Sequence, residues 1–221
     1  MGKQIRPLHD WDMTPAEAIA LQQRLRQQVR LETHPGPVGR VAGVDVSVKG
    51  KRSRAAVVVL SFPDLQPADQ ALAELPVPFP YVPGLLSFRE GPVVLAAFER
   101  LTRWPDLVIF DGQGLAHPRR LGLACHMGLI LDLPSIGCAK SRLCGQHEEP
   151  GPNRGDWASL YDGDEVIGAV VRSRPGTKPL YVSPGHRVDL EQSIHYVLAC
   201  CTRYRLPETT RQAHRLCGKW P

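Results

Sequence analysis

The sequence lacks every segment that would place the chain in or across a membrane. No apolar run approaches the roughly 18 residues that a transmembrane helix needs. Residues 1–12 contain no apolar stretch of the kind that forms the centre of a secretory signal peptide. We therefore expect a cytoplasmic protein with no membrane partner.

Cysteines are present but lack any spacing that would bind zinc. There is no C-x-x-C pair, and two of the six cysteines are adjacent in the chain, which fits neither a zinc site nor a disulfide framework. We expect reduced thiols, some of them buried as small apolar residues. The six are Cys125, Cys138, Cys144, Cys200, Cys201 and Cys217.

Internal repeats and low-complexity segments are also missing. The 221 residues are 43% hydrophobic and 22% charged, which is ordinary for a globular protein and argues against disorder. The 20 glycines and 21 prolines follow no Gly-X-Y period, so they exclude collagen and predict many turns. The net charge of +5 suits an anionic partner such as nucleic acid, although many basic proteins bind nothing anionic.

Hydrophobic periodicity predicts one α/β domain over residues 1–221. Three strands that follow one another through short loops form an antiparallel meander. Two later strands alternate with helices and should pair in parallel, which gives a mixed sheet with helices on both faces. The meander strands are expected over 41–48, 55–62 and 68–77, and the parallel strands over 106–111 and 135–139.

Helices and a late hairpin complete the predicted fold. A helix capped by Thr14 runs to about Arg30, and Gln22 falls on the face that we expect to be solvated. A polar loop is expected over 145–157. Further helices are expected over 85–103, 118–131, 189–203 and 208–217, and the hairpin strands over 165–171 and 180–183.

Three acidic residues are candidates for one cluster. Asp45 lies within a strand on the same side as the small residues Gly43 and Ser47, which leave room for a ligand. Asp111 ends the strand LVIF and precedes glycines, where α/β folds place ligands. Glu90 lies at the start of a predicted helix. Converging carboxylates would suit magnesium or manganese, which activates water and stabilises charge on a phosphate.

Each acid also has a purely structural interpretation. Asp45 could be a partly exposed strand acid or one paired with Lys or Arg. Asp111 could form an Asx turn. Ser87 and Glu90 have the spacing of a helix capping box.

Basic residues follow the second acid. His117 precedes a predicted helix with Arg119 and Arg120 in its first turn, where cations oppose the helix dipole unless an anion binds there. Lys140 ends the next strand and could reach the same site. The alternative is that these are ordinary surface side chains.

A proline-rich loop presents a single aromatic ring. In Pro80-Tyr81-Val82-Pro83-Gly84, two prolines stiffen the backbone, so Tyr81 is held at little entropic cost. A rigid ring can wedge into a base stack and occupy the space of an extruded base. The alternative is a plain turn with Tyr81 packed on the surface.

Together these segments resemble the endonuclease V family of deoxyinosine 3′-endonucleases. The resemblance runs from Val41 to His214, and Val82 stands where isoleucine is common. The segments that carry it are VAGVDVS, PYVPGLLSFREGP, PDLVIFDGQGLAHPRRLGLACHMGL, IGCAKSRLCG, VSPGHRVD and RLPETTRQAH.

The resemblance implies an RNase H-like fold and a role for each candidate. Asp45 and Asp111 would ligate Mg²⁺, or Mn²⁺ in its place, and Glu90 would complete the cluster directly or through water. His117 and Lys140 would lie around the scissile phosphate. The residues expected to bind the substrate are Pro80, Tyr81, Val82, Pro83 and Gly84 in the wedge segment, Gly84, Gly112, Gly114 and Gly122 in the base pocket, and His214.

The implied activity is DNA repair by a monomeric enzyme. It would hydrolyse the second phosphodiester bond 3′ to deoxyinosine by metal-activated water, and leave a 3′-hydroxyl and a 5′-phosphate. Two alternatives remain open: a ribonuclease that acts at inosine in RNA, and a non-catalytic module that binds damaged or single-stranded nucleic acid.

Overall fold

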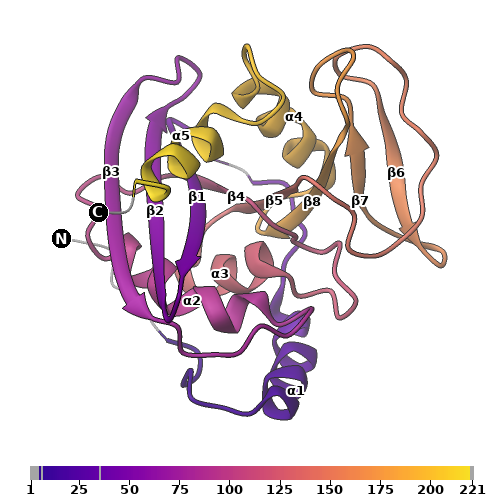
Figure 1. Ribbon diagram of the computed structural model, residues 1–221. Helices are drawn as coiled ribbons and strands as arrows, with labels where there is room; N and C mark the ends of the chain where they lie inside the picture. Colours follow the sequence, from indigo (N-terminus) through magenta and orange to yellow (C-terminus); the bar gives the residue numbers. More distant parts are fainter. Residues whose placement is uncertain (1–4, 6, 35, 220–221) are drawn as a thin grey trace.

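One mixed β-sheet organises the chain. The computed structural model describes residues 5, 7–34 and 36–219. The eight strands lie in the order β3-β2-β1-β4-β5-β8-β7-β6 (Figure 1). They are β1 (Arg40–Lys49), β2 (Arg52–Ser61), β3 (Pro67–Pro76), β4 (Leu107–Phe110), β5 (Ser135–Ala139), β6 (Trp157–Asp162), β7 (Glu165–Val171) and β8 (Leu180–His186).

The predicted topology is confirmed. Strands β1, β2 and β3 form an antiparallel meander, and β1, β4 and β5 then pair in parallel. Strands β8, β7 and β6 extend the sheet in antiparallel pairs beyond β5. The carboxyl ends of β4 and β5 therefore lie beside each other, next to the middle of β1.

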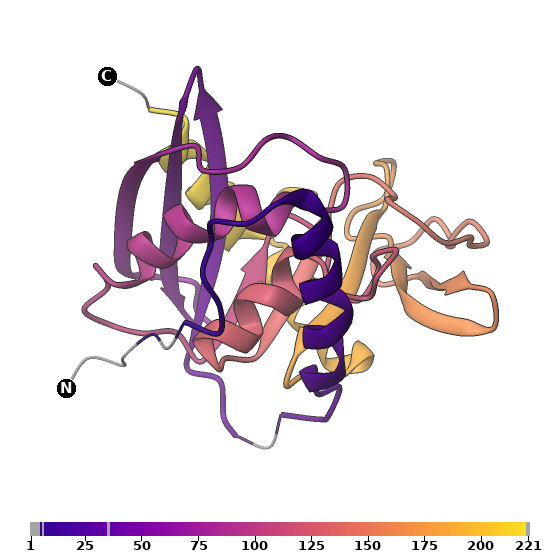
Figure 2. The same cartoon turned by 90° about the horizontal axis from the view of Figure 1, so that it is seen from below.

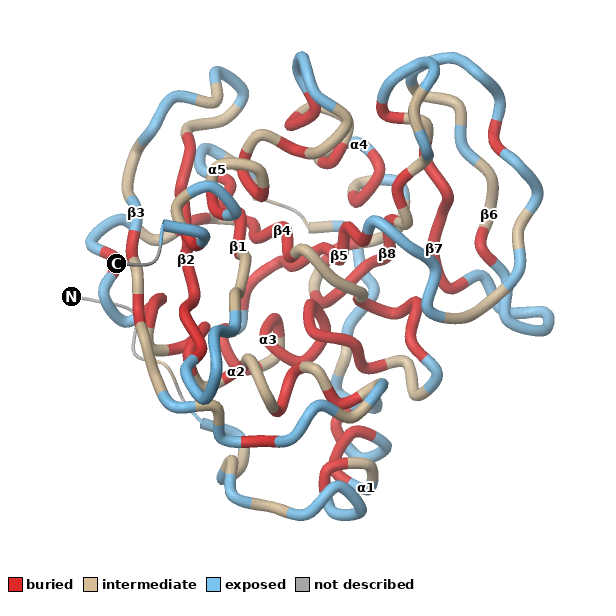
Figure 3. The backbone as a smooth tube through the Cα atoms, viewed as in Figure 1, coloured by how far each residue is buried: buried red, intermediate tan, exposed pale blue. Residues whose placement is uncertain are grey.

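Helices cover both faces of the sheet. Helices α2 and α3 pack on one face with α1 outside them, and α4 and α5 pack on the other (Figures 1 and 2). Strands β2, β4, β5 and β8 and helix α3 are almost entirely buried, whereas most residues of the edge strands β3 and β6 are partly or fully exposed (Figure 3). The helices are α1 (Pro15–Leu25), α2 (Leu86–Phe98), α3 (Leu123–Leu131), α4 (Leu190–Cys200) and α5 (Glu208–Cys217).

The predicted cap of the first helix is present, but the helix is shorter than expected. The Thr14 hydroxyl accepts a hydrogen bond from the Glu17 N–H at 3.3 Å, and the Glu17 carboxylate accepts one from the Thr14 N–H at 2.7 Å. Helix α1 ends at Leu25, and a short 3₁₀ turn (Arg26–Gln28) follows.

In the second half of the chain, the start of one helix was predicted wrongly and one strand was not predicted. Helix α3 begins at Leu123 rather than at residue 118, because Arg120 takes a left-handed backbone conformation (φ 55°) that no α-helix contains. The guanidinium of Arg120 instead pairs with Asp162 at 2.8 Å and Glu165 at 2.7 Å. These two acids end β6 and begin β7, and β6 is an edge strand that we did not predict.

A glycine brings β1 against α5. A Cβ added at Gly43 would overlap the backbone of Thr209 and Thr210, so only glycine permits this close approach. Helix α5 carries His214, and the approach therefore sets the position of that side chain over β1.

We expect Gly43→Ala to lower the free energy of unfolding by about 2 kcal/mol, because the helix must shift to admit a methyl group. Urea denaturation measures this effect. Gly39→Ala is the matched control, since its Cβ would meet only the Asp106 carboxylate at 3.6 Å. Equal stability of the two variants would contradict the packing argument.

The burial of the cysteines agrees with the expectation of small, partly buried thiols. All six cysteines are free thiols, and all except the half-buried Cys144 are buried. Within the described part of the chain, no helix combines the length and the apolar character needed to cross a bilayer.

Candidate active site

Two aspartates lie side by side because their strands are parallel neighbours. The pairing of Val44 with Phe110 brings Asp45 and Asp111, each one residue further on, to the same place on the sheet. The Asp111 N–H donates to the Val44 carbonyl at 3.3 Å, which ties the end of β4 to β1. The two carboxylates are thus 66 positions apart in sequence but adjacent in the fold.

The carboxylates of the site act on one another electrostatically. Burial and the neighbouring charge of Asp111 raise the pKa of Asp45. Burial, followed by the charge of Asp45 and a smaller effect of Asp111, raises the pKa of Glu90 to about 8. All three candidate acids therefore share one electrostatic environment, in which each added negative charge is opposed.

Two basic side chains offset part of this negative charge. Lys140, directly after β5, forms an ion pair with the Asp111 carboxylate. His214 from α5 lies with its Nδ1 at 3.1 Å from the Asp45 Oδ2. Asp45 is thus paired with a histidine and not with the Lys or Arg of its structural interpretation, and both basic partners, His214 and Lys140, are themselves candidate site residues.

The capping-box interpretation of Glu90 is wrong. The residue that caps α2 is Leu85, and no side chain caps this helix. The Ser87 hydroxyl is instead hydrogen-bonded to Nδ1 of the buried His126 at 2.9 Å. Glu90 therefore does not cap α2, and capping does not explain why a partly buried acid lies at this position.

The carboxylates at this site suit a hard divalent cation that takes only a few of its ligands from the protein. Within residues 5, 7–34 and 36–219, no three His, Cys, Asp or Glu side chains are grouped so that they could hold a metal ion among themselves. Magnesium needs no such cage, because it is held by one or two carboxylates together with water and substrate phosphate. Asp45 and Asp111 provide that pair, and the excess of buried negative charge favours a cation there.

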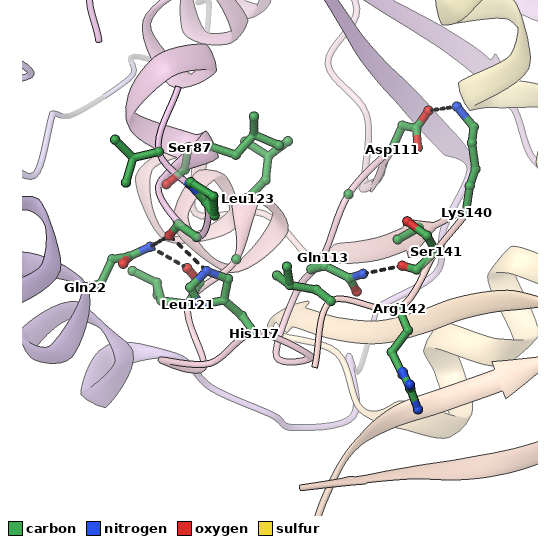
Figure 4. Close-up of a pocket in the computed structure, with 18 of the residues that line it drawn as sticks. Gln22, Ser87, Asp111, Gln113, His117, Leu121, Leu123, Lys140, Ser141 and Arg142 are labelled. Atoms are coloured by element: carbon green, nitrogen blue, oxygen red, sulfur yellow. Dashed lines mark hydrogen bonds and ion pairs between the residues drawn. The ribbon is translucent and has the colours of Figure 1, made fainter. Parts of the chain in front are cut away.

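A cavity of about 330 Å³ lies beside the aspartates (Figure 4). Asp111, Lys140 and His117 line it together with much of the proline-rich loop. Of the predicted pocket glycines, three contribute to its wall and Gly114 does not, because Gly114 packs against the Pro184 carbonyl of β8. The three are Gly84, Gly112 and Gly122.

Several lining residues were not predicted. Gln22 was expected on a solvated face of α1, but it is 1% exposed and faces the cavity. Gln113 lines the cavity and donates from its amide to the Ser141 carbonyl at 3.0 Å. The segment 141–143 closes the same side. The polar residues near Gln22 in the sequence gave no indication that its side chain is buried. Nothing in the sequence of residues 141–143 indicated that they line a cavity.

His117 is buried beneath the proline-rich loop and lines the cavity with Asp111 and Lys140. Its Nε2 donates to the Gly84 carbonyl at 3.0 Å, and its Nδ1 accepts the Arg119 N–H at 3.1 Å. Burial lowers the pKa of His117 to about 4, so the ring is neutral at pH 7. In this arrangement both ring nitrogens are engaged, and the imidazole holds the loop.

Tyr81 projects from a loop that is anchored at both ends. Its side chain is among the most open of the large hydrophobic residues, at 71% exposed, which excludes the packed-turn interpretation. Before it, Phe79 is buried against Phe88, and after it, Leu85 is buried as well. We call residues 80–84 the wedge loop.

An aspartate within one strand and a second directly after its parallel neighbour, on a mixed sheet with helices on both faces, are the arrangement of the RNase H-like class of nucleases. The chain belongs to the endonuclease V family, whose model matches residues 23–215. The family consists of nucleases, so the alternative of a non-catalytic binding module is set aside.

Relatives and solved structures agree over nearly the whole chain. Endonuclease V of Alkalilimnicola ehrlichii is 57% identical, covering 98% of this chain and 96% of that protein. The crystal structure of endonuclease V from Streptomyces avermitilis matches with a TM-score of 0.90 at 46% identity, covering 94% and 92% of the two chains. Ciona intestinalis endonuclease V matches with a TM-score of 0.78 at 26% identity, covering 94% and 98%; that protein is in complex with DNA containing an inosine followed by a ribo-adenosine.

Proposed function

We propose that this protein recognises deoxyinosine in DNA and hydrolyses the second phosphodiester bond 3′ to the lesion. The products would carry a 3′-hydroxyl and a 5′-phosphate, and the base would stay attached. The observation that carries this proposal is the placement of paired aspartates, a cavity and an exposed tyrosine on one side of the molecule. The inosine-containing DNA held by the Ciona relative supports the choice of lesion.

Asp45 and Asp111 are the residues that would hold Mg²⁺, with Mn²⁺ able to replace it. When bound, such an ion supplies a Lewis acid for the phosphate and lowers the pKa of water. Glu90 lies near enough to Asp45 and Asp111 for their charges to raise its pKa, and it would add negative charge to the site once a bound cation favours its ionised form. Lys140 contributes a positive charge beside Asp111, where phosphate oxygens would be attracted.

Lesion selectivity would come from the cavity and the wedge loop. Tyr81 would fill the space that a base leaves in the stack, and the extruded hypoxanthine would enter the cavity. Contacts from Lys and Arg to the phosphate backbone would add salt-dependent affinity without base selectivity. His117 would support the wedge loop, since its ring nitrogens already bond to Gly84 and Arg119.

We further propose that the enzyme works as a monomer in the cytoplasm. Six free cysteines fit a reducing compartment. Action at inosine in RNA is the second candidate, and the ribo-adenosine in the DNA bound by the Ciona relative is the observation that favours it.

The test compares two duplexes that differ only in deoxyinosine or deoxyadenosine at one position. We expect nicking of the deoxyinosine duplex with Mg²⁺, no nicking with a chelator, and a cut at the second bond that a polymerase can extend. A parallel RNA containing inosine shows which sugar is preferred. Equal cleavage of the deoxyadenosine duplex would overturn the proposed selectivity.

A further inference from the structure

A buried glutamine on α1 reaches the base of the wedge loop. The Gln22 amide nitrogen donates to the Gly84 carbonyl at 3.0 Å and to the Leu121 carbonyl at 3.1 Å. Its amide oxygen accepts from Nε of Arg119 at 2.6 Å. One side chain thus joins α1, the end of the wedge loop and the loop that leads into α3.

The Gly84 carbonyl is the point at which these contacts meet. Besides Gln22, it accepts from Nη2 of Arg119 at 2.8 Å and from Nε2 of His117 at 3.0 Å. Figure 4 shows the bonds from Gln22 and His117 on the wall of the cavity. We call Gln22, His117 and Arg119, with their three bonds to this carbonyl, the Gly84 clamp.

The clamp acts where the wedge loop would otherwise move most easily. Gly84 has a φ of 79°, a conformation that glycine adopts without strain and that gives the chain freedom to turn. The other end of the loop is fixed by the buried Phe79, whose carbonyl accepts a bond from Arg89 at 3.4 Å. With Gly84 held, the exposed Tyr81 is carried between two fixed points.

We propose that the Gly84 clamp fixes the wedge loop for insertion into double-stranded DNA, and that Gln22 is a positioning residue for this step. The inference rests on the proposed function. A ring that is already in place loses little freedom on entering a base stack, so the clamp lowers the cost of opening the duplex. Single-stranded DNA has no pairing to open and does not need that help.

Stability alone does not account for Gln22. An apolar side chain would fill a buried helix position without the desolvation that an amide requires. The amide is retained at a position where all its contacts lead to the wedge loop, the cavity wall or Arg119. We therefore expect the loss of the Gln22 amide to impair opening of the duplex and not folding of the protein.

The experiment compares Gln22→Leu with its neighbour Gln23→Leu, since Gln23 is exposed on the same helix. For Gln22→Leu we expect kcat/KM on a deoxyinosine duplex to fall about tenfold more than kcat/KM on the same strand without its complement, whose change measures the contribution of Gln22 to the cavity wall alone. Gln23→Leu should match the wild type on both substrates. Tyr81→Ala should give the same duplex-specific loss, and combining it with Gln22→Leu should add little further.

Equal losses on duplex and single strand, or no loss on the duplex, would overturn the clamp proposal. If Gln22→Leu does not fold, Arg119→Lys decides the matter, because lysine keeps the charge but cannot bridge Gln22 and Gly84 as the guanidinium does. A wild-type enzyme that nicks neither deoxyinosine substrate would instead overturn the proposed function.

Discussion

Replacement of Asp45 by asparagine should reduce nicking of a deoxyinosine duplex by on the order of a thousandfold and leave DNA binding largely intact. Asparagine keeps the size of the side chain but removes the negative charge that Asp45 shares with Asp111. Single-turnover nicking and an equilibrium binding assay with the same duplex measure the two effects separately.

The same substitution should stabilise the fold. Asp45 is buried to 11% side-chain exposure beside another acid, so its ionised form is held at a cost. We expect Asp45→Asn to raise the free energy of unfolding by about 1 kcal/mol in a chelating buffer at pH 8. Asp64→Asn, at an exposed position, is the control. Full nicking activity of Asp45→Asn would contradict the proposed role of the aspartate pair.

Glu90→Gln should abolish a strong pH dependence of stability. The pKa of Glu90 is about 8 in the folded protein against an ordinary value of 4.5, so the folded state binds more protons between these values. Stability from this group is full below about pH 4.5 and is lost as the pH rises through about 8. Without a divalent cation, the wild type should lose roughly 3–4 kcal/mol relative to Glu90→Gln between pH 5 and pH 8.

Urea denaturation of both proteins at a series of pH values gives this difference. The buried histidines whose pKa values are lowered titrate in both proteins, so the difference between them isolates Glu90. Adding Mg²⁺ at pH 8 should restore more stability to the wild type than to the variant. Parallel stability curves for the two proteins would show that the pKa of Glu90 is not raised in the folded protein.

The sequence was sufficient to predict the arrangement of the sheet around the two aspartates. Short loops between the first three strands require antiparallel pairing, and the helices that separate the later strands require parallel pairing. The end of LVIF was therefore expected beside the strand that carries Asp45, and the register of β1 with β4 puts it there. Residue type and strand order were enough for this part of the site.

What could not be predicted depends on contacts between distant segments. Gln22 has the periodicity of a surface residue, and only the packing of α1 against the wedge loop buries it. Arg120 was placed in a helix because no local feature reveals its pairing with Asp162 and Glu165. We expected His117 near the scissile phosphate, and the sequence gave no indication of its hydrogen bond to the Gly84 carbonyl or of its burial.

The central claim is that Asp45 and Asp111 together hold a divalent cation beside the cavity. A titration of Mn²⁺ followed by electron paramagnetic resonance, with nicked deoxyinosine DNA present, tests it most directly. We expect the wild type to bind the ion, and Asp45→Asn and Asp111→Asn each to weaken its binding at least about tenfold. Unchanged Mn²⁺ affinity in both variants would show that the two aspartates do not hold the ion.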